Sequence, residues 1–263
     1  MNKMLVTGGS GFLGKRIKAK YDAVAPNHAE MDITDVELCL RILDRYKPQI
    51  VIHCAAISDT AYCAKHPEEG FLINVLGAEN IARACTQFGT KLIFASSDQV
   101  YSGGDAPHSE NEKVLPAGPY GEMKQEAEKR ILELLSDAVC LRLSWMYDVP
   151  QPERPSFLSQ LKGNSIMKLS DKEYRGITWV MEVVEQIEKI ALLPGGIYNA
   201  GSPNQYTTYE TGCKVVQHLK SNNLAAAELE KGDWFRNLAM DISKIEKYGI
   251  QFSNTVDRLL QLV

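Results

Sequence analysis

The chain has 263 residues, 44% of them hydrophobic, and 29 Lys and Arg against 33 Asp and Glu give a net charge of −4. A chain of this length can bury a full core, either as one domain or as one domain with a small cap. No long basic run and no apolar stretch of membrane-spanning length occurs, so neither nucleic acid nor a membrane is an expected partner.

Short apolar runs alternate with helical patterns over the first two hundred residues. Strands are predicted at 4–6, 23–25, 49–53, 91–95, 138–143 and 196–199. Helices are predicted at 11–20, from a cap at Thr34 or Asp35 to Tyr46, from Pro67 through Ala84, and from Pro119 through Leu135. Nearly continuous apolar strands between helices indicate a doubly wound parallel α/β sheet, because such strands are covered on both faces.

The alternation ends after residue 147. Pro150, Pro152 and Pro155 mark a loop-rich stretch, and the region after Gly201 mixes turns with short helices. We therefore predict a main domain over 1–147, to which 176–200 returns. The segments 148–175 and 201–263 are predicted to form a smaller C-terminal cap.

A glycine turn follows the first predicted strand. Residues 7–14 read Thr-Gly-Gly-Ser-Gly-Phe-Leu-Gly, which fits both GxxGxxG and GxGxxG. In such a turn Gly8 allows the tight bend, Gly11 lets the backbone approach a pyrophosphate, and Gly14 permits close helix packing. The first amides of the next helix would face the phosphates. This order of strand, turn and helix predicts a dinucleotide site.

The acidic residue expected at the adenosine ribose is harder to assign. Residues 26–28 (Pro-Asn-His) end the second predicted strand without a carboxylate, whereas Asp32 follows Gly14 by 18 residues. Two interpretations stay open: Asp32 contacts the cofactor, or it belongs to a helix-capping network with Thr34 and Asp35. Without a carboxylate at the strand tip, the choice between NAD and NADP is undecided.

Tyr120 and Lys124 lie four residues apart in a predicted helix, and therefore on one face of it. A nearby ammonium lowers the pKa of a phenol from about 10 toward neutrality, as general acid–base catalysis requires. Of the eleven tyrosines, only Tyr120 has a lysine four places on. Ser97 follows a buried strand, where a parallel sheet presents its ligands. These three residues, the catalytic trio, predict nicotinamide redox chemistry on a carbonyl or hydroxyl group.

The glycine turn and the catalytic trio resemble those of the extended short-chain dehydrogenase/reductase superfamily. Within it, three segments are similar to the dTDP-4-dehydrorhamnose reductases: Ser-Ser-Asp-Gln-Val-Tyr at 96–101, Tyr-Gly-Glu-Met-Lys at 120–124 and Arg-Leu-Ser-Trp-Met-Tyr at 142–147. The similarity spans most of the chain. It implies a Rossmann-type doubly wound sheet with a small C-terminal substrate-binding cap, NAD(P)H as cofactor and a nucleotide sugar as substrate.

The resemblance also implies a role for each matched residue. Ser97 would hold the substrate carbonyl, Tyr120 would protonate it, and Lys124 would also bind the nicotinamide ribose. Besides Tyr120 and Lys124, the implied cofactor-binding residues are Gly8, Gly11, Phe12, Leu13, Gly14, Asp32, Ile33, Ala55, Ala56 and Ile57. The implied substrate-binding residues are Ser97, Asp98 and Trp145. Asn74 matches a position that supports the active site in relatives.

The chain departs from the reductase pattern on the sugar side. An acidic pair of the family is missing from 58–64, and Trp234 stands where an arginine is expected. The function predicted first is an NAD(P)H-dependent reductase of a keto group on a nucleotide-linked sugar. Two alternatives remain: a nucleotide-sugar epimerase or dehydratase, and a non-catalytic regulatory subunit that binds the cofactor. The complete trio favours an enzyme, and the sugar-side departures favour the regulatory subunit.

The six cysteines form no CxxC pair and lie mostly in apolar segments, which is typical of reduced thiols in a cytoplasmic protein. The first strand begins near residue 4, which leaves no room for a signal peptide. We expect a cytoplasmic location and no metal site, since His53 and Cys54 occupy a strand end that must lie near the cofactor. The residues do not decide the oligomeric state, and a homodimer stays open.

Overall fold

The computed structural model describes residues 3–101, 106–149, 156–163 and 165–263. The predicted loop around Pro150, Pro152 and Pro155 therefore lies outside the described residues. Contacts divide the chain into two compact units. The first consists of Met1–Val100, Val114–Arg142 and Val184–Tyr198, and the second of Tyr101–Lys113, Leu143–Val183 and Asn199–Val263. Over the described ranges, no helix combines the length and the hydropathy needed to cross a bilayer.

A parallel sheet forms the centre of the first unit. In the described part of the chain its order is β1-β2-β3-β4-β8, namely Met4–Thr7, Ile50–His53, Lys91–Ser97, Val139–Leu143 and Gly196–Ala200. Val6 pairs with Ile52. The strand predicted at 23–25 is only an isolated bridge, in which Val24 pairs with Leu5. It ends there because Pro26 has no N–H with which to continue a ladder.

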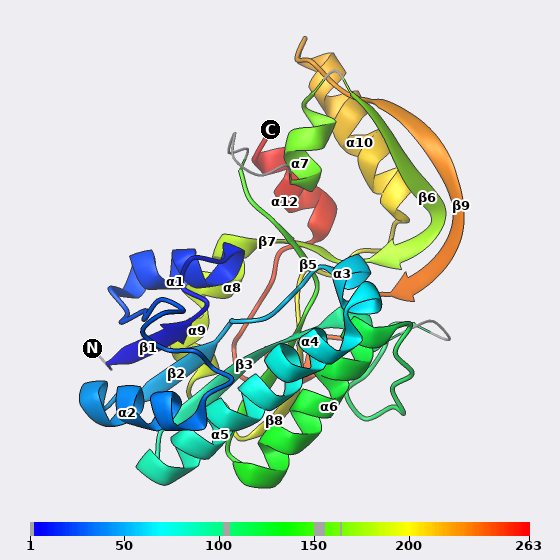
Figure 1. The fold of residues 1–263 in the computed structure, drawn as a ribbon. Coiled ribbons are helices and arrows are strands. Elements are labelled where there is room, and N and C mark those ends of the chain that lie inside the picture. The colour runs from blue at the N-terminus through cyan, green and yellow to red at the C-terminus, as the bar shows by residue number, and fades with distance from the viewer. Residues whose placement is uncertain (1–2, 102–105, 150–155, 164) are drawn as a thin grey trace. The chain divides into compact units, whose positions relative to one another are not determined.

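Helices cover both faces of this sheet (Figure 1). One layer contains α2 (Val36–Tyr46), α5 (Gly77–Phe88) and α6 (Pro119–Leu134), and the other contains α1 (Phe12–Tyr21) and α9 (Ile187–Ile190). Leu5, Val51 and Leu92 belong to the core under the first layer. Because side chains alternate along a strand, Val6 and Ile52 face the second layer. The predicted doubly wound α/β sheet is confirmed.

The helix predicted from Pro67 is continuous but not uniform. It follows α3 (Thr60–Lys65) and consists of α4 (Pro67–Phe71), a π-helical turn η1 (Leu72–Leu76) and α5. The side chain of Asn74, in the middle of η1, is buried. A π-helical turn contains one residue more than an α-helical turn and is frequent at functional sites.

The second unit has two small sheets of its own. β5 (Trp145–Tyr147) pairs with β7 (Ile177–Trp179), and β6 (Ile166–Arg175) pairs in parallel with β9 (Glu228–Leu238). The remaining elements of the second unit are α7 (Phe157–Leu161), α8 (Val180–Glu185, which ends in the first unit), α10 (Thr208–Ser221), α11 (Ser243–Glu246) and α12 (Thr255–Gln261), whereas the short helical turn η2 (Asp98–Val100) belongs to the first unit. α10 lies along the β6–β9 ribbon (Figure 1), and Leu169, Val215 and Leu219 share its core.

Candidate active site

The turn after β1 is packed too tightly for any residue but glycine at two positions. Gly8 has φ +67°, and a Cβ there would lie 2.7 Å from the backbone nitrogen of Ala55. A Cβ on Gly14 would lie 2.3 Å from the carbonyl oxygen of Gly8. The start of α1 therefore packs directly on the turn. The amides of its first turn have no intrahelical acceptor and suit an anion.

This turn lies where the sheet changes direction. β1 pairs with Val24 on one side and with β2 on the other. The chain therefore places the next segment after β1 on one side of it and then crosses over to form β2 on the other side. In open α/β sheets ligands bind at the carboxyl ends of the strands at such a point. A cavity of about 870 Å³ opens there. Its lining includes six predicted cofactor residues: Gly8, Asp32, Ile33, Ala55, Ala56 and Ile57.

Other residues of the cavity differ from the predicted set. Gly11, Phe12, Leu13 and Gly14 begin α1 and are not among the described lining residues. Lys15, Lys18, Asn27 and His28 line the cavity and were not predicted. Lys15 and Lys18 could have been predicted from their three-residue spacing just after the glycine turn, because this spacing puts both side chains on one face of α1.

Asp32 lies at the cavity and is also hydrogen-bonded within its own loop. It lines the cavity, and its Oδ1 accepts hydrogen bonds from the Thr34 nitrogen at 2.9 Å and the Thr34 hydroxyl at 2.8 Å. These bonds hold the pKa of Asp32 below its usual value. The N-cap of α2 is Asp35, whose side chain accepts from the amides of Glu37 and Leu38. Asp32 thus shapes the loop, and its carboxylate is turned toward that loop.

Asn74 fixes the loop that follows β2. Its Oδ1 accepts from the Ile57 nitrogen at 2.8 Å, and its Nδ2 donates to the Ile57 carbonyl oxygen at 2.9 Å. Ile57 lines the cavity. The π-helical turn η1 therefore presents an amide that satisfies both backbone groups of a cavity residue.

The end of β3 and the start of α6 bring Ser97 and Tyr120 together. Ser97 is the last residue of β3, and its hydroxyl lies 3.3 Å from Asp98 Oδ1 and accepts from the Gln99 nitrogen at 3.2 Å. A Cβ on Gly121 would meet the Gln99 carbonyl oxygen at 2.1 Å, so α6 begins directly against η2. In this arrangement the Ser97 hydroxyl lies close enough to the Tyr120 phenol to act on its pKa.

Lys124 lies one helical turn further along α6, with its side chain only 3% exposed. Its Nζ donates to the Ala95 carbonyl oxygen at 2.8 Å and lies 4.6 Å from the centre of the Phe94 ring. It lies 5.8 Å from the centre of the Tyr120 ring. All three members of the catalytic trio therefore belong to the first unit and lie around the carboxyl end of β3.

The pKa of Tyr120 differs from the prediction. Burial raises it above its usual value, the charge of Asp98 raises it further, and the hydrogen bond with Ser97 opposes both. The prediction that Lys124 lowers this pKa is wrong for the chain's own groups, because Lys124 binds Ala95 instead and burial dominates. Burial also lowers the pKa of Lys124 to about 8. Tyr120 thus keeps its proton throughout the neutral range, as a proton donor must.

Trp145 belongs to the second unit. Its ring packs edge-on against Phe157 at 5.4 Å, and the guanidinium carbon of Arg175 lies 5.1 Å from its centre. Asp98, the other predicted sugar contact, is 2% exposed at the start of η2.

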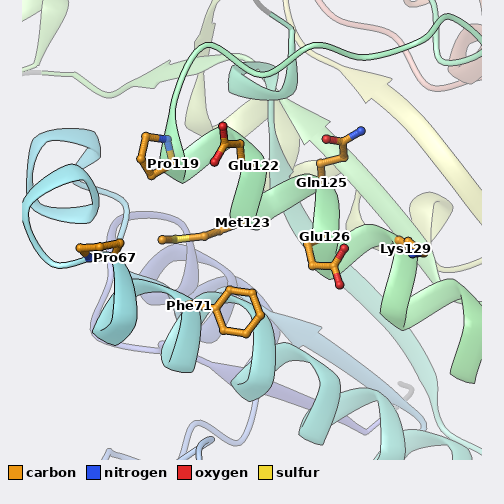
Figure 2. A pocket seen from close by; sticks show the side chains of 8 residues that line it. All are labelled: Pro67, Phe71, Pro119, Glu122, Met123, Gln125, Glu126 and Lys129. Atoms are coloured by element: carbon orange, nitrogen blue, oxygen red, sulfur yellow. The ribbon is translucent and has the colours of Figure 1, made fainter.

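A second pocket, of about 670 Å³, lies between α4 and α6. Figure 2 shows Met123 and Phe71 between the two helices, with the polar side chains of Glu122, Gln125 and Lys129 along α6. The amide of Asn74 lies 3.9 Å from Met123 Sδ. Of the residues that line this pocket on α6, Glu122 and Lys129 are exposed, and they offer positions for control substitutions.

Comparison with known proteins identifies the family. The profile of the RmlD substrate binding domain matches residues 1–237. The chain belongs to this family. The resemblance to the extended short-chain dehydrogenase/reductases, and within them to the dTDP-4-dehydrorhamnose reductases, is thereby confirmed.

Individual relatives with similar sequences carry different names. The chain is 27% identical over 278 residues to methionine adenosyltransferase 2 subunit beta of Xenopus tropicalis, covering 94% of this chain and 83% of that one. It is 27% identical over 222 residues to dTDP-4-keto-6-deoxy-D-glucose reductase of Streptomyces niveus, covering 80% of this chain and 76% of that one.

Solved structures share the fold at lower identity. dTDP-4-dehydrorhamnose reductase of Bacillus anthracis, in complex with NADP, superposes with a TM-score of 0.86 at 21% identity, over 99% of this chain and 97% of that one. UDP-glucose 4-epimerase of Thermus thermophilus, in complex with NAD, superposes with a TM-score of 0.77 at 22% identity, over 99% of this chain and 100% of that one.

Proposed function

We propose that this chain is an NAD(P)H-dependent reductase of a keto group on a nucleotide-linked sugar. The observation that carries the proposal is the catalytic trio at the end of β3. It combines a partly buried tyrosine that holds its proton, a serine beside it and a lysine one helical turn away. A hydroxyl that remains protonated at neutral pH beside a second hydroxyl is suited to binding and protonating a carbonyl oxygen.

The cavity at the β1–β2 ends supports a dinucleotide as the cofactor. Its volume of about 870 Å³ is in the range of cofactor sites. The close approach of Gly8 and Gly14 leaves backbone, without side chains, beside the start of α1. Backbone amides at a helix N-terminus bind a pyrophosphate, and these residues therefore fit the group.

The proposed chemistry divides between the cofactor and the trio. When bound, a reduced nicotinamide supplies the hydride for the carbonyl carbon. Tyr120 donates its proton to the carbonyl oxygen, while the Ser97 hydroxyl orients that oxygen. Lys124 supplies a positive charge near the phenol as it loses its proton, and this charge is present below the lysine's pKa of about 8.

The finer proposal is a dTDP-linked 4-keto sugar as the substrate. Two kinds of relative support it: the Streptomyces reductase, whose name specifies dTDP-4-keto-6-deoxy-D-glucose, and the reductase of Bacillus anthracis, which acts on dTDP-4-dehydrorhamnose. The segments 96–101, 120–124 and 142–147 carry the same resemblance in the sequence.

A second candidate is a non-catalytic regulatory subunit. The similarity to a methionine adenosyltransferase beta subunit over 94% of the chain favours it, as do the missing acidic pair in 58–64 and Trp234. Such a subunit would bind the dinucleotide in the same cavity but would not reduce a sugar. The two candidates therefore differ in turnover and agree in cofactor binding.

The test is oxidation of NADH and NADPH by wild type and Tyr120→Phe with dTDP-, UDP- and GDP-linked 4-keto sugars. We expect turnover with a dTDP-linked sugar, and loss of the general acid should lower kcat by about 10²–10⁴-fold. Cofactor affinity, measured by NAD(P)H fluorescence, should be the same in both proteins. Tyr46→Phe, on α2, is the matched control. Cofactor binding without turnover in wild type would replace the reductase with the regulatory subunit.

A further inference from the structure

A buried ion pair links the helix of the catalytic trio to two strands of the sheet. Glu128 on α6 and Arg142 on β4 are each 2% exposed. Arg142 Nη2 donates to Glu128 Oε2 at 2.8 Å, and its Nε donates to Oε1 at 3.1 Å. The hydroxyl of Ser96 on β3 donates to the same Oε1 at 2.5 Å. One carboxylate thus joins α6, β3 and β4.

An ion pair of this kind is a poor way to stabilise a core. Moving two charges out of water costs several kcal/mol per ion, and apolar residues of similar volume often give equal or greater stability. The pair instead fixes the orientation of the Glu128 side chain, because a carboxylate that is bound by both a guanidinium and a hydroxyl is held in one position. Because the pair joins α6, β3 and β4, it also fixes the position of α6 relative to these two strands.

Glu128 lies on the same face of α6 as Tyr120 and Lys124. Tyr120, Lys124 and Glu128 follow one another at four-residue intervals and therefore lie along one face of α6. Consecutive residues of β3 contact this face: Ala95 accepts from Lys124, Ser96 donates to Glu128, and Ser97 lies beside Tyr120 and acts on its pKa. Of these partners, Glu128 is also hydrogen-bonded to a third element, β4, through Arg142.

Glu128 also acts on the charge of Lys124. Burial lowers the pKa of Lys124 to about 8, and the charge of Glu128 is among the effects that oppose this. The other titratable groups around Lys124 are His53 at the end of β2, Cys54, Cys63 on α3 and Cys140 on β4. Burial holds the pKa of His53 low and the pKa values of the thiols Cys54 and Cys140 high, so these groups are neutral at pH 7. The Glu128 carboxylate is then the negative charge on the inner face of α6.

We propose that Glu128, oriented by Arg142 and Ser96, is a positioning residue for the reductase reaction. It sets α6 against β3 so that Tyr120 meets Ser97, and it keeps Lys124 in the ammonium form at neutral pH. The positioning role rests on the proposed function, whereas the effect on Lys124 does not.

Two variants separate charge from position. Glu128→Gln keeps the shape and an acceptor oxygen but removes the charge. The fall in kcat above neutral pH should then begin about one pH unit lower than in wild type, with KM for NAD(P)H unchanged. Glu128→Asp keeps the charge but shortens the side chain, so kcat should fall by about tenfold or more while the pH of the inflection stays. Glu126→Gln is the control, since Glu126 pairs with Arg130 at the surface of the same helix.

A second measurement is independent of turnover. The free energy of unfolding of wild type relative to Lys124→Met should begin to rise with pH where folded Lys124 loses its proton, and in a Glu128→Gln background this difference should begin to rise about one pH unit lower. If wild type reduces no sugar but this onset moves, the proposed function fails and the effect on Lys124 stands. If wild type is active and both variants have its pH profile and kcat, Glu128 is merely structural and the inference fails. Should Glu128→Gln not fold, an unchanged kcat in Glu128→Asp alone would overturn the positioning role.

Discussion

Lys124 has a buried ammonium group, so its removal should change how stability depends on pH. Its pKa is about 8 in the folded chain, against 10.5 for a lysine in water. Below pH 8 both states hold the proton, and burial of the charge destabilises the fold to its full extent. As the pH rises from about 8 to 10.5, the folded state releases the proton first, and the free energy of unfolding therefore increases. The difference in pKa corresponds to about 3 kcal/mol over this range.

The assay is urea unfolding of wild type and Lys124→Met between about pH 7 and about pH 9.5. The stability of wild type relative to the variant should rise by about 2 kcal/mol between pH 8 and 9.5, since each pH unit contributes about 1.4 kcal/mol. Lys129→Met is the control, because Lys129 is exposed on the outer side of the same helix (Figure 2) and should follow wild type. Parallel curves for wild type and Lys124→Met would refute the reasoning that burial dominates the titration of Lys124.

Two further predictions concern the cofactor cavity. Gly8→Ala should lower the free energy of unfolding, measured with urea, by about 1–3 kcal/mol more than Gly89→Ala, and it should weaken NAD(P)H binding. Gly89 is the control because it has the same left-handed backbone but open space around it. Equal losses of stability would show that the backbone of Ala55 moves easily to make room. In coenzyme choice, kcat/KM for NADH and NADPH should differ by less than about a hundredfold, or ~3 kcal/mol, since no carboxylate ends the Val24 segment. Lys18→Glu should shift the ratio toward NADH, and no shift would exclude contact between Lys18 and the 2′-phosphate.

The central sheet could be predicted because its strands are buried on both faces. In β2, for example, Ile50, Val51 and Ile52 are all apolar, which is typical of a parallel strand covered on both faces. The glycine turn could be predicted for a similar reason, because Gly8 occupies a backbone conformation that other residues rarely adopt. In the second unit β9 is largely exposed and rich in charged residues, and its pattern did not reveal the long ribbon it forms with β6.

The electrostatics of the trio could not be predicted from spacing. A four-residue interval puts Tyr120 and Lys124 on one helix face, but it does not say how deeply either is buried. Nor does it show that the Ala95 carbonyl oxygen binds the lysine Nζ. The sign of the shift in the Tyr120 pKa depends on both facts. In the same way, the sequence named Asp32 but not the hydrogen bonds with Thr34 that turn its carboxylate toward the loop.

The π-helical turn at Leu72–Leu76 makes this stretch of the chain sensitive to length. Each residue of a helix turns the next by about 100°, so deletion of one residue here would restore α-helical pairing and rotate α4 by that angle relative to α5. Asn74 could not then keep both of its hydrogen bonds to Ile57. Homologous proteins that share the cavity should accordingly align through this segment without gaps, whatever insertions their surface loops have accepted.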